Sequence, residues 1–452
     1  MRIMTRRAVL STALASLALG GCSLDLQNPN APTETQVTTS PDGVIALATG
    51  LQGRFATSYG NFAYMAGLVT DEFAATSAAL ISISDAEQGA VAPGTGIADA
   101  VFNSVYRTVR SADDLLAGAN AQASQLEPGT RSGLIALAQA LKAEAIGEAL
   151  QSYQRVPIRT FGETTPVYVP RAEALPYVRA LLDSAAQQLT TTPPSTFFTT
   201  SILTPGVNLN AMIQLFRARY ARLANDQANA VAYANLVPRT GPAAFSAFQF
   251  PAPTVNFYSN VTGGTNGIAV RRQWRTSMAA GDQRFVWFVT PSATLTGRVG
   301  AALDPWSRYA SPQAPLPVYF PDEALLIKAE GLAQQGQLAA AQAAVDSVRT
   351  DCTGGRGLDD PKACLGALAG SLTQAQLLEE IYTQRRYELL GTGLRWEDAR
   401  RRTAVRGPVN APGVPIDGQR CWLPYAIGDR NANPNVPADP AEPATFPTGC
   451  QL

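Results

Sequence analysis

Apolar residues recur at helical spacing over much of the chain, most regularly in residues 321–402. Two runs on either side of Gly336 place apolar side chains every three or four residues, as on one face of a helix. Pro321 suits a first helical position, and the two acidic residues after it favour the positive end of the helix dipole. The pattern predicts a helical hairpin, with Ala329 and Ala341 where its two helices approach closely.

The same pattern of paired, Ala-rich helices occurs twice earlier in the chain. Residues 209–237 have an apolar helix, a polar break at Asn225 and Asp226, and a second helix. Gly147 belongs to a third such stretch. Helix pairs of this kind cannot bury their apolar faces alone, so the sequence predicts stacked pairs of the tetratricopeptide type.

Between these helical runs, in residues 237–321, the helical period fades and aromatic, Gly and Thr residues take over. This stretch predicts short strands and loops, which a rigid scaffold can use to position a site. Flat aromatic faces beside amide and hydroxyl groups suit sugar rings, although aromatic side chains also fill cores. The candidate ligand contacts are Tyr258, Trp274, Trp287, Trp306 and Tyr309.

Composition excludes several classes of function. The 452 residues are 46% hydrophobic and 15% charged, which indicates a globular protein with a large core. The chain has 35 Lys and Arg residues and 35 Asp and Glu residues, so it has no excess of positive charge with which to hold nucleic acid. The chain has no histidine, which removes imidazole bases and imidazole metal ligands. Without a nucleophile elbow, a metal motif or a phosphate loop, the sequence predicts a protein that is not an enzyme and has no cofactor.

The first residues predict export and a lipid anchor. Residues 1–21 combine a basic start with an apolar run that is too short to span a bilayer, as in a signal peptide. The run ends in Leu-Gly-Gly-Cys, the form of a lipobox, which predicts lipidation of Cys22. An ordinary signal peptide with a chance cysteine is the alternative, and the pair Arg6-Arg7 leaves both general and twin-arginine export open.

After the lipobox the chain is organised as a tether and one domain. Residues 22–40 are polar and rich in Pro, Asn and Thr, so they predict a flexible tether. Helices are expected to begin near Pro41, with Ser40 as N-cap. Later Pro-rich stretches read as loops within one compact unit, residues 41–452.

Four cysteines remain after Cys22. In an exported protein they favour two disulfides, and Cys352 with Cys364 plus Cys421 with Cys450 is the most local of three connectivities. A metal site built from four thiolates is the alternative, but no Cys-x-x-Cys spacing supports it.

The densest charged set with apolar neighbours lies near the end of the helical region. It could supply carboxylates for acid–base chemistry, or a buried network in which arginines pair with carboxylates. The second interpretation is favoured, because two members three residues apart share one helix face and paired charges can lie inside a helical core. The set is Arg385, Glu388, Arg395, Asp398 and Arg400.

Five segments follow one another in a characteristic order: GLVTDEF, VFNSVYRTVRSADDLL, ALKAEAIGEALQSYQRVPI, IYTQRRYELLGTGLRWEDARR and LPYAIGDRNANPNV. Together they resemble the SusD/RagB-like family of outer-membrane nutrient-binding lipoproteins. The fourth segment is the most specific, with Gln384 in place of the family's usual Glu and Ala399 in place of its Leu.

The resemblance implies a mostly α fold: a SusD-like scaffold of tetratricopeptide helix pairs with an irregular loop and short-strand ligand region. It places the ligand face in residues 257–309, with help from residues 84–96. It also implies a lipid-anchored outer-membrane protein of the cell surface, which binds a nutrient oligomer and delivers it to a TonB-dependent (SusC-like) transporter. A glycan is the family's usual ligand, and a peptide remains open. The alternatives are a scaffold lipoprotein of an assembly machine and a secreted hydrolase.

Overall fold

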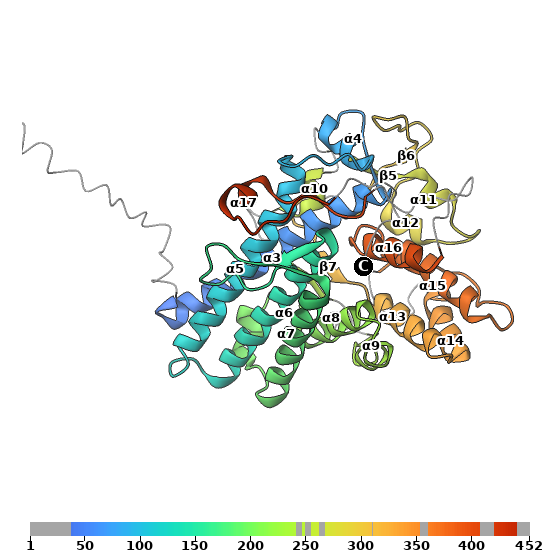
Figure 1. The fold of residues 1–452 in the computed structure, drawn as a ribbon. Coiled ribbons are helices and arrows are strands. Elements are labelled where there is room, and N and C mark those ends of the chain that lie inside the picture. The colour runs from blue at the N-terminus through green and yellow to red at the C-terminus, as the bar shows by residue number, and fades with distance from the viewer. Residues whose placement is uncertain are drawn as a thin grey trace, which may run out of the picture.

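The computed structural model describes residues 38–240, 246–248, 255–261, 267–309, 311–352, 360–406 and 420–440. Helices dominate this part of the chain, as predicted, and the strands form three small sheets (Figure 1). The predicted signal sequence, Cys22 and most of the predicted tether lie outside the described residues. The helices of the first half are α3 (Pro41–Val69), α4 (Ile81–Glu87), α5 (Gly96–Ala121), α6 (Pro128–Ser152), α7 (Arg171–Thr191), α8 (Leu209–Leu223) and α9 (Gln227–Ala234).

The helices of the second half complete an array in which neighbours in the sequence pack side by side. Contacts run from α3 to α5, α6, α7, α8 and α9, and on to α13, which packs on α14 and α15. Figure 1 shows α5, α6 and α7 on one side of the ribbon and α13, α14 and α15 on the other, with α8 and α9 between them. The remaining long helices are α13 (Pro321–Gln334), α14 (Leu338–Arg349), α15 (Gln374–Glu388) and α16 (Arg395–Arg406), followed by a short α17 (Ile427–Ala432).

The helix boundaries follow from local sequence. Ser40 accepts a hydrogen bond from the Gly43 amide at 3.1 Å, which confirms it as the N-cap of α3. Gly336 has φ +75° between α13 and α14, and Asn225 has φ +56° between α8 and α9. Both hairpin breaks therefore lie at the positions that the sequence indicated.

Small residues allow the helices to approach closely. Ala329 and Ala341 are fully buried, as expected for the hairpin of α13 and α14. Gly147 on α6 leaves room for a side chain of α8, since a Cβ atom on it would come 1.5 Å from the hydroxyl oxygen of Tyr220. No residue larger than glycine fits there unless the tyrosine moves.

A buried cation joins three of these helices. Arg219 on α8 donates to Glu323 on α13 through Nε and Nη2, each at 2.8 Å, and to Glu144 on α6 through Nη1. All three side chains are buried. The arginine charge offsets carboxylates that would otherwise be expensive to remove from water.

The irregular region expected between the helical runs contains short helices and strands. β1 (Phe73–Ala75), β5 (Ile268–Arg271) and β6 (Leu303–Asp304) form one antiparallel sheet in that order. In Figure 1 this sheet lies with α4, α11 and α12 above the helical array. The short helices of the irregular region are α10 (Phe257–Val261), α11 (Arg272–Thr276) and α12 (Arg284–Phe288). The other pairs are β2 (Arg155–Pro157) with β3 (Tyr168–Pro170), and β4 (Ser246–Phe248) with β7 (Leu316–Tyr319).

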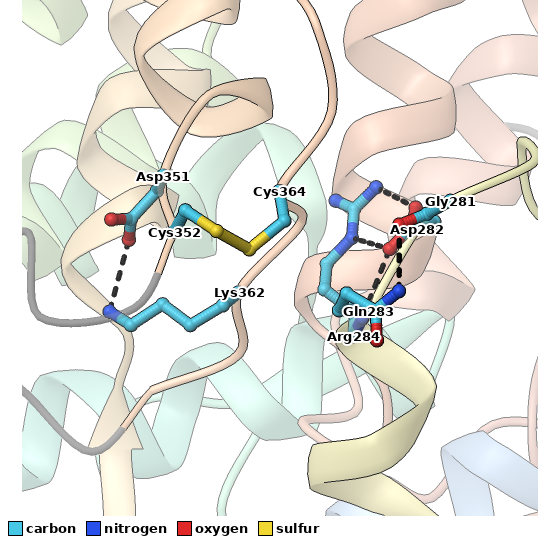
Figure 2. The surroundings of a disulfide bond; sticks show 8 residues. All are labelled: Gly281, Asp282, Gln283, Arg284, Asp351, Cys352, Lys362 and Cys364. Atoms are coloured by element: carbon cyan, nitrogen blue, oxygen red, sulfur yellow. Dashed lines mark hydrogen bonds and ion pairs between the residues drawn. A yellow bond between two sulfur atoms is a disulfide. The ribbon is translucent and has the colours of Figure 1, made fainter.

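Cys352 and Cys364 form a disulfide with an S–S distance of 2.01 Å, the local pairing that the sequence favoured (Figure 2). Because these two thiols are oxidised, a metal site built from all four thiolates is excluded. Cys450 lies outside the described residues, so its pairing with Cys421 stays a prediction. Within the described part of the chain, no helix combines the length and the apolar character needed to cross a membrane.

Candidate functional site

Three of the five aromatic residues expected to contact a ligand are core residues. Tyr258, Trp274 and Trp306 expose 0%, 1% and 5% of their surface. A ring stacks on a sugar only if one of its faces is open, and these rings are covered. The expectation that they bind a ligand is therefore corrected.

The covered rings attach the irregular region to the turn between α15 and α16. Tyr258 stacks on Trp306 with 5.1 Å between ring centroids, and its hydroxyl donates to the carbonyl of Gly391. Trp274 donates from its indole nitrogen to the carbonyl of Arg386 at 3.2 Å. A Cβ atom on Gly391 would lie 2.7 Å from Trp306, so the glycine is also required by this packing.

The two remaining candidates, Trp287 and Tyr309, are half-buried. Their ring centroids lie 5.8 Å apart at an interplanar angle of 79°. The Arg308 guanidinium carbon lies over the Trp287 ring, 4.1 Å from its centroid. We call Trp287, Arg308 and Tyr309 the aromatic face.

The backbone explains why these three residues meet. Val289 pairs with Trp306 in an isolated antiparallel bridge, and the Ser307 amide donates to the carbonyl of Phe288 at 3.0 Å, which brings positions 287 and 308 close together. Tyr309 follows with φ +57°, an uncommon conformation for a residue with a side chain. The bridge brings the guanidinium onto the indole.

The start of α12 is held from both sides. Arg284 is fully buried, donates to Asp282, and lies 3.5 Å from Glu388 on α15. On the other side, the Gln283 amide donates to the carbonyl of Ala363 at 3.1 Å, next to the disulfide. Figure 2 shows residues 281–284 facing the disulfide segment. The short helix that carries Trp287 is therefore fixed before the aromatic face begins.

The second predicted ligand segment, residues 84–96, contains the end of α4 and a loop. Arg420 donates to the carbonyls of Gly89 and Val91 at 3.0 and 3.1 Å and so orders this loop. Arg298 donates to the carbonyl of Ala79 at 2.7 Å, which connects the start of α4 to the irregular region. A role of this segment in ligand binding stays a prediction.

A cavity of about 540 Å³, which we call the helical cleft, opens between α7, the end of α8, α13, α15 and α16. Sequence reasoning did not identify it. Its apolar wall contains Leu175, Leu223, Leu378 and Ile381. Its charged residues are Arg171, Arg179, Arg222, Arg385 and Arg401 with Glu330, Glu379, Glu397 and Asp398.

Ion pairs across the helical cleft connect its walls. Arg222 contacts Glu330 at 2.5 Å and Asp398 at 2.8 Å, and Arg385 contacts Asp398 at 2.7 Å. Arg401 contacts Glu330 at 2.7 Å. Burial by itself raises the pKa of Glu330, but the charges of Arg222 and Arg401 outweigh it and lower that pKa to about 2.

Comparison with known proteins assigns the fold. The sequence profile of the SusD family matches residues 309–418. This part of the chain is SusD-like in sequence. The structure of NanU from B. fragilis aligns with a TM-score of 0.68 at 12% identity, covering 92% of this chain and 100% of NanU. Surface glycan-binding protein A from Bacteroides uniformis aligns with a TM-score of 0.65 at 15% identity, covering 86% and 99%.

Another SusD superfamily protein, from Bacteroides vulgatus, aligns with a TM-score of 0.63 at 12% identity, covering 90% of this chain and 98% of its own. No curated protein matches the sequence. The SusD-like fold thus spans the helical array and the irregular region together.

The charged set of this SusD-like protein is a buried network, as the sequence favoured. Arg385 pairs with Asp398, while Glu388 faces Arg284 on the segment before α12. Arg400 donates to Glu397 at 3.0 Å. Burial raises the pKa of Asp398, but nearby arginines outweigh it and hold that pKa well below its usual range. A carboxyl group that stays ionised is a poor general acid.

One acidic cluster of the SusD-like protein has the spacing of a cation site. Oxygens of Asp322, Asp351 and Asp360 lie within 4.8 Å of one another. The Lys362 ammonium, however, contacts Asp351 at 3.0 Å and also contacts Asp360. The lysine therefore already supplies positive charge to the cluster.

Proposed function

We propose that this SusD-like protein is a cell-surface nutrient-binding protein that holds a glycan oligomer on the aromatic face. The observation that carries the proposal is the half-buried pair Trp287 and Tyr309, with the Arg308 guanidinium beside the indole. The fold shared with a surface glycan-binding protein supports the same class of ligand.

The chemistry of the aromatic face suits a sugar. The C–H face of a sugar ring can pack on the open part of an aromatic ring, and each such contact contributes about 1 kcal/mol beyond the area buried. The Arg308 guanidinium carries several N–H donors, which can bond sugar hydroxyl groups. A peptide is the alternative ligand, since it can also use aromatic and guanidinium contacts.

Delivery to a TonB-dependent transporter and attachment through lipidated Cys22 belong to the same proposal. The lipobox, the polar residues 22–40 and the family resemblance support them. A rigid helical array also offers the broad surface that a stable protein complex needs. We expect the native protein to co-purify with a barrel transporter from mild detergent, and Cys22→Ala to release it from the membrane fraction.

The ligand proposal is tested by a glycan array followed by calorimetric titration of the best glycan. Trp287→Ala removes the half-buried indole and should weaken binding about fivefold, which corresponds to about 1 kcal/mol. Phe161→Ala is the control, because the Phe161 ring is accessible and also has an arginine, Arg110, over it at 5.4 Å. Equal effects of the two substitutions would place the ligand elsewhere.

A further inference from the structure

In two ion pairs of the helical cleft the arginine is the more exposed partner. Arg171 exposes 15% of its side chain, whereas its partner Glu397 exposes 2%. Arg401 exposes 16%, and its partner Glu330 exposes 9%. A molecule in the cleft can therefore reach these two arginines more easily than their carboxylate partners.

Two guanidinium donors in the cleft wall remain unused among the described residues. All five lining arginines have a carboxylate partner, and Arg179 pairs with Asp226 next to the cleft. Nη1 of Arg385 and Nη1 of Arg401 are buried and have no hydrogen-bond acceptor within the described part of the chain. Burial and, after it, the neighbouring Arg222 lower the pKa of Arg385, so the charge of this buried arginine is not fully compensated.

Apolar side chains also line the cleft. Leu175, Leu378 and Ile381 contribute side chains from α7 and α15. The cavity of about 540 Å³ falls in the range of small-molecule pockets, about 300–1,000 Å³. It is too small for a folded partner but large enough for a ligand with a charged end and a less polar body.

We propose that the helical cleft is a second binding site, which accepts a small organic carboxylate. The carboxylate contacts the exposed edges of Arg171 and Arg401, and the rest of the molecule packs against the apolar wall. Planar guanidinium groups bind carboxylates through paired N–H donors. Glu379, half-buried at the same cleft, opposes an anion and limits its affinity. The site is separate from the aromatic face and does not depend on the proposed function.

The first experiment compares ligands of matched shape and different charge. Calorimetry on the intact protein uses digalacturonate with its dimethyl ester, and N-acetylated trialanine with its C-terminal amide. At least one acid should bind, at least tenfold more tightly than its neutral derivative, and higher salt should weaken it. Binding of the sugar acid alone identifies an acidic saccharide as ligand, and binding of the peptide alone identifies a peptide carboxylate. If neither acid binds, or if each binds no better than its neutral form, the proposal is wrong.

The second experiment uses substitutions with opposite expected signs. Arg401→Gln should weaken the acid about tenfold, since it removes a charged hydrogen bond. Glu379→Gln should strengthen it two- to fivefold, because it removes a repelling charge. Arg349→Gln is the matched control: Arg349 exposes 16% of its side chain and pairs with Glu380, but does not line the cleft among the residues described.

These outcomes remain decisive if one variant does not fold. Should Arg401→Gln be unstable, an unchanged affinity in Glu379→Gln overturns the proposal. Trp287→Ala should leave the affinity for the acid unchanged, whereas it weakens a glycan on the aromatic face. Loss of acid binding in Trp287→Ala would therefore place the acid on the aromatic face and contradict a site in the cleft.

Discussion

The helical array and the irregular region bury opposite kinds of side chain. Where α8, α13, α15 and α16 meet, arginines and carboxylates are buried as pairs, among them Arg222 with Asp398. In the irregular region, large aromatic rings are buried instead, as Trp274 and Tyr258 show. In neither region, therefore, does the type of a residue reveal whether its side chain is exposed. Charged residues are buried between the helices of the array, and most of the aromatic rings that the sequence suggested as sugar contacts form a core instead.

The largest expected effect lies on the helical side of this comparison. Arg219→Ala leaves Glu144 and Glu323 buried without their shared cation, which should cost about 3–5 kcal/mol of unfolding free energy. Urea denaturation followed by circular dichroism measures it. Arg110→Ala is the control, since its pair with Asp114 is largely exposed and should contribute less than about 1 kcal/mol. Similar losses in both variants would show that the buried network does not hold the array together.

A comparable effect is expected in the irregular region. Trp274→Ala removes a buried ring and should destabilise the protein by about 3–5 kcal/mol. Trp287→Ala should cost clearly less, because its ring is half-buried. Thermal unfolding ranks the two variants, and titration of the folded fraction gives their affinities. A Trp274→Ala protein that stays fully stable but loses its glycan would restore Trp274 as a ligand contact.

A pH effect of intermediate size is expected where the two regions meet. Glu72 is buried between β1 and the turn at Gly391, whose amide donates to it at 3.3 Å. Burial raises the pKa of Glu72 to about 7. Between about pH 4.5, the pKa of Glu72 in the unfolded state, and about pH 7, the unfolded state loses this proton while the folded state keeps it. The stability that the protonated carboxyl group contributes is therefore lost as pH rises through this range.

Glu72→Gln imitates the protonated carboxyl group and removes this dependence. The variant should match the native protein near pH 4.5 and be roughly 2–3 kcal/mol more stable at pH 8. Urea titrations at the two pH values measure the difference. A variant that is equally or less stable at pH 8 would mean that Glu72 is ionised without penalty in the folded protein.

The smallest expected effect concerns a turn of the helical array. Gly336→Ala forces a side chain into φ +75° and should cost about 1 kcal/mol, although nothing lies within 4 Å of the added methyl group. Gly366→Ala adds a methyl group in equally open space without a positive φ, so its stability should be unchanged. If the two variants unfold at the same temperature, the left-handed turn is not strained.

The features that the sequence predicted correctly are those that depend on residues close together in the chain. Helix periodicity, the Ser40 cap and the break at Gly336 are local features, and the structure has each of them. The sequence also predicted the charged network around Asp398, because its residues lie on two consecutive helices. The exposure of Trp287 against the burial of Trp306 was not predictable, since both occur in the same Gly- and Thr-rich setting.

The helical cleft was missed for a different reason. It joins residues far apart in the chain, such as Arg171 and Glu397, which are 226 positions apart. Helical periodicity shows which face of a helix is apolar, but it does not show which distant helix will lie opposite. Arginines near the ends of several helix pairs, including Arg222 and Arg401, were the available signal.

The contact between Gly147 and Tyr220 has a consequence for how such sequences diverge. Since a Cβ atom at position 147 would overlap the tyrosine hydroxyl group, position 147 cannot gain a side chain while Tyr220 keeps its place. Relatives with a larger residue at the first position should therefore carry a smaller one at the second. Covariation between these two positions, rather than invariance of both, should be the evolutionary trace of this helix contact.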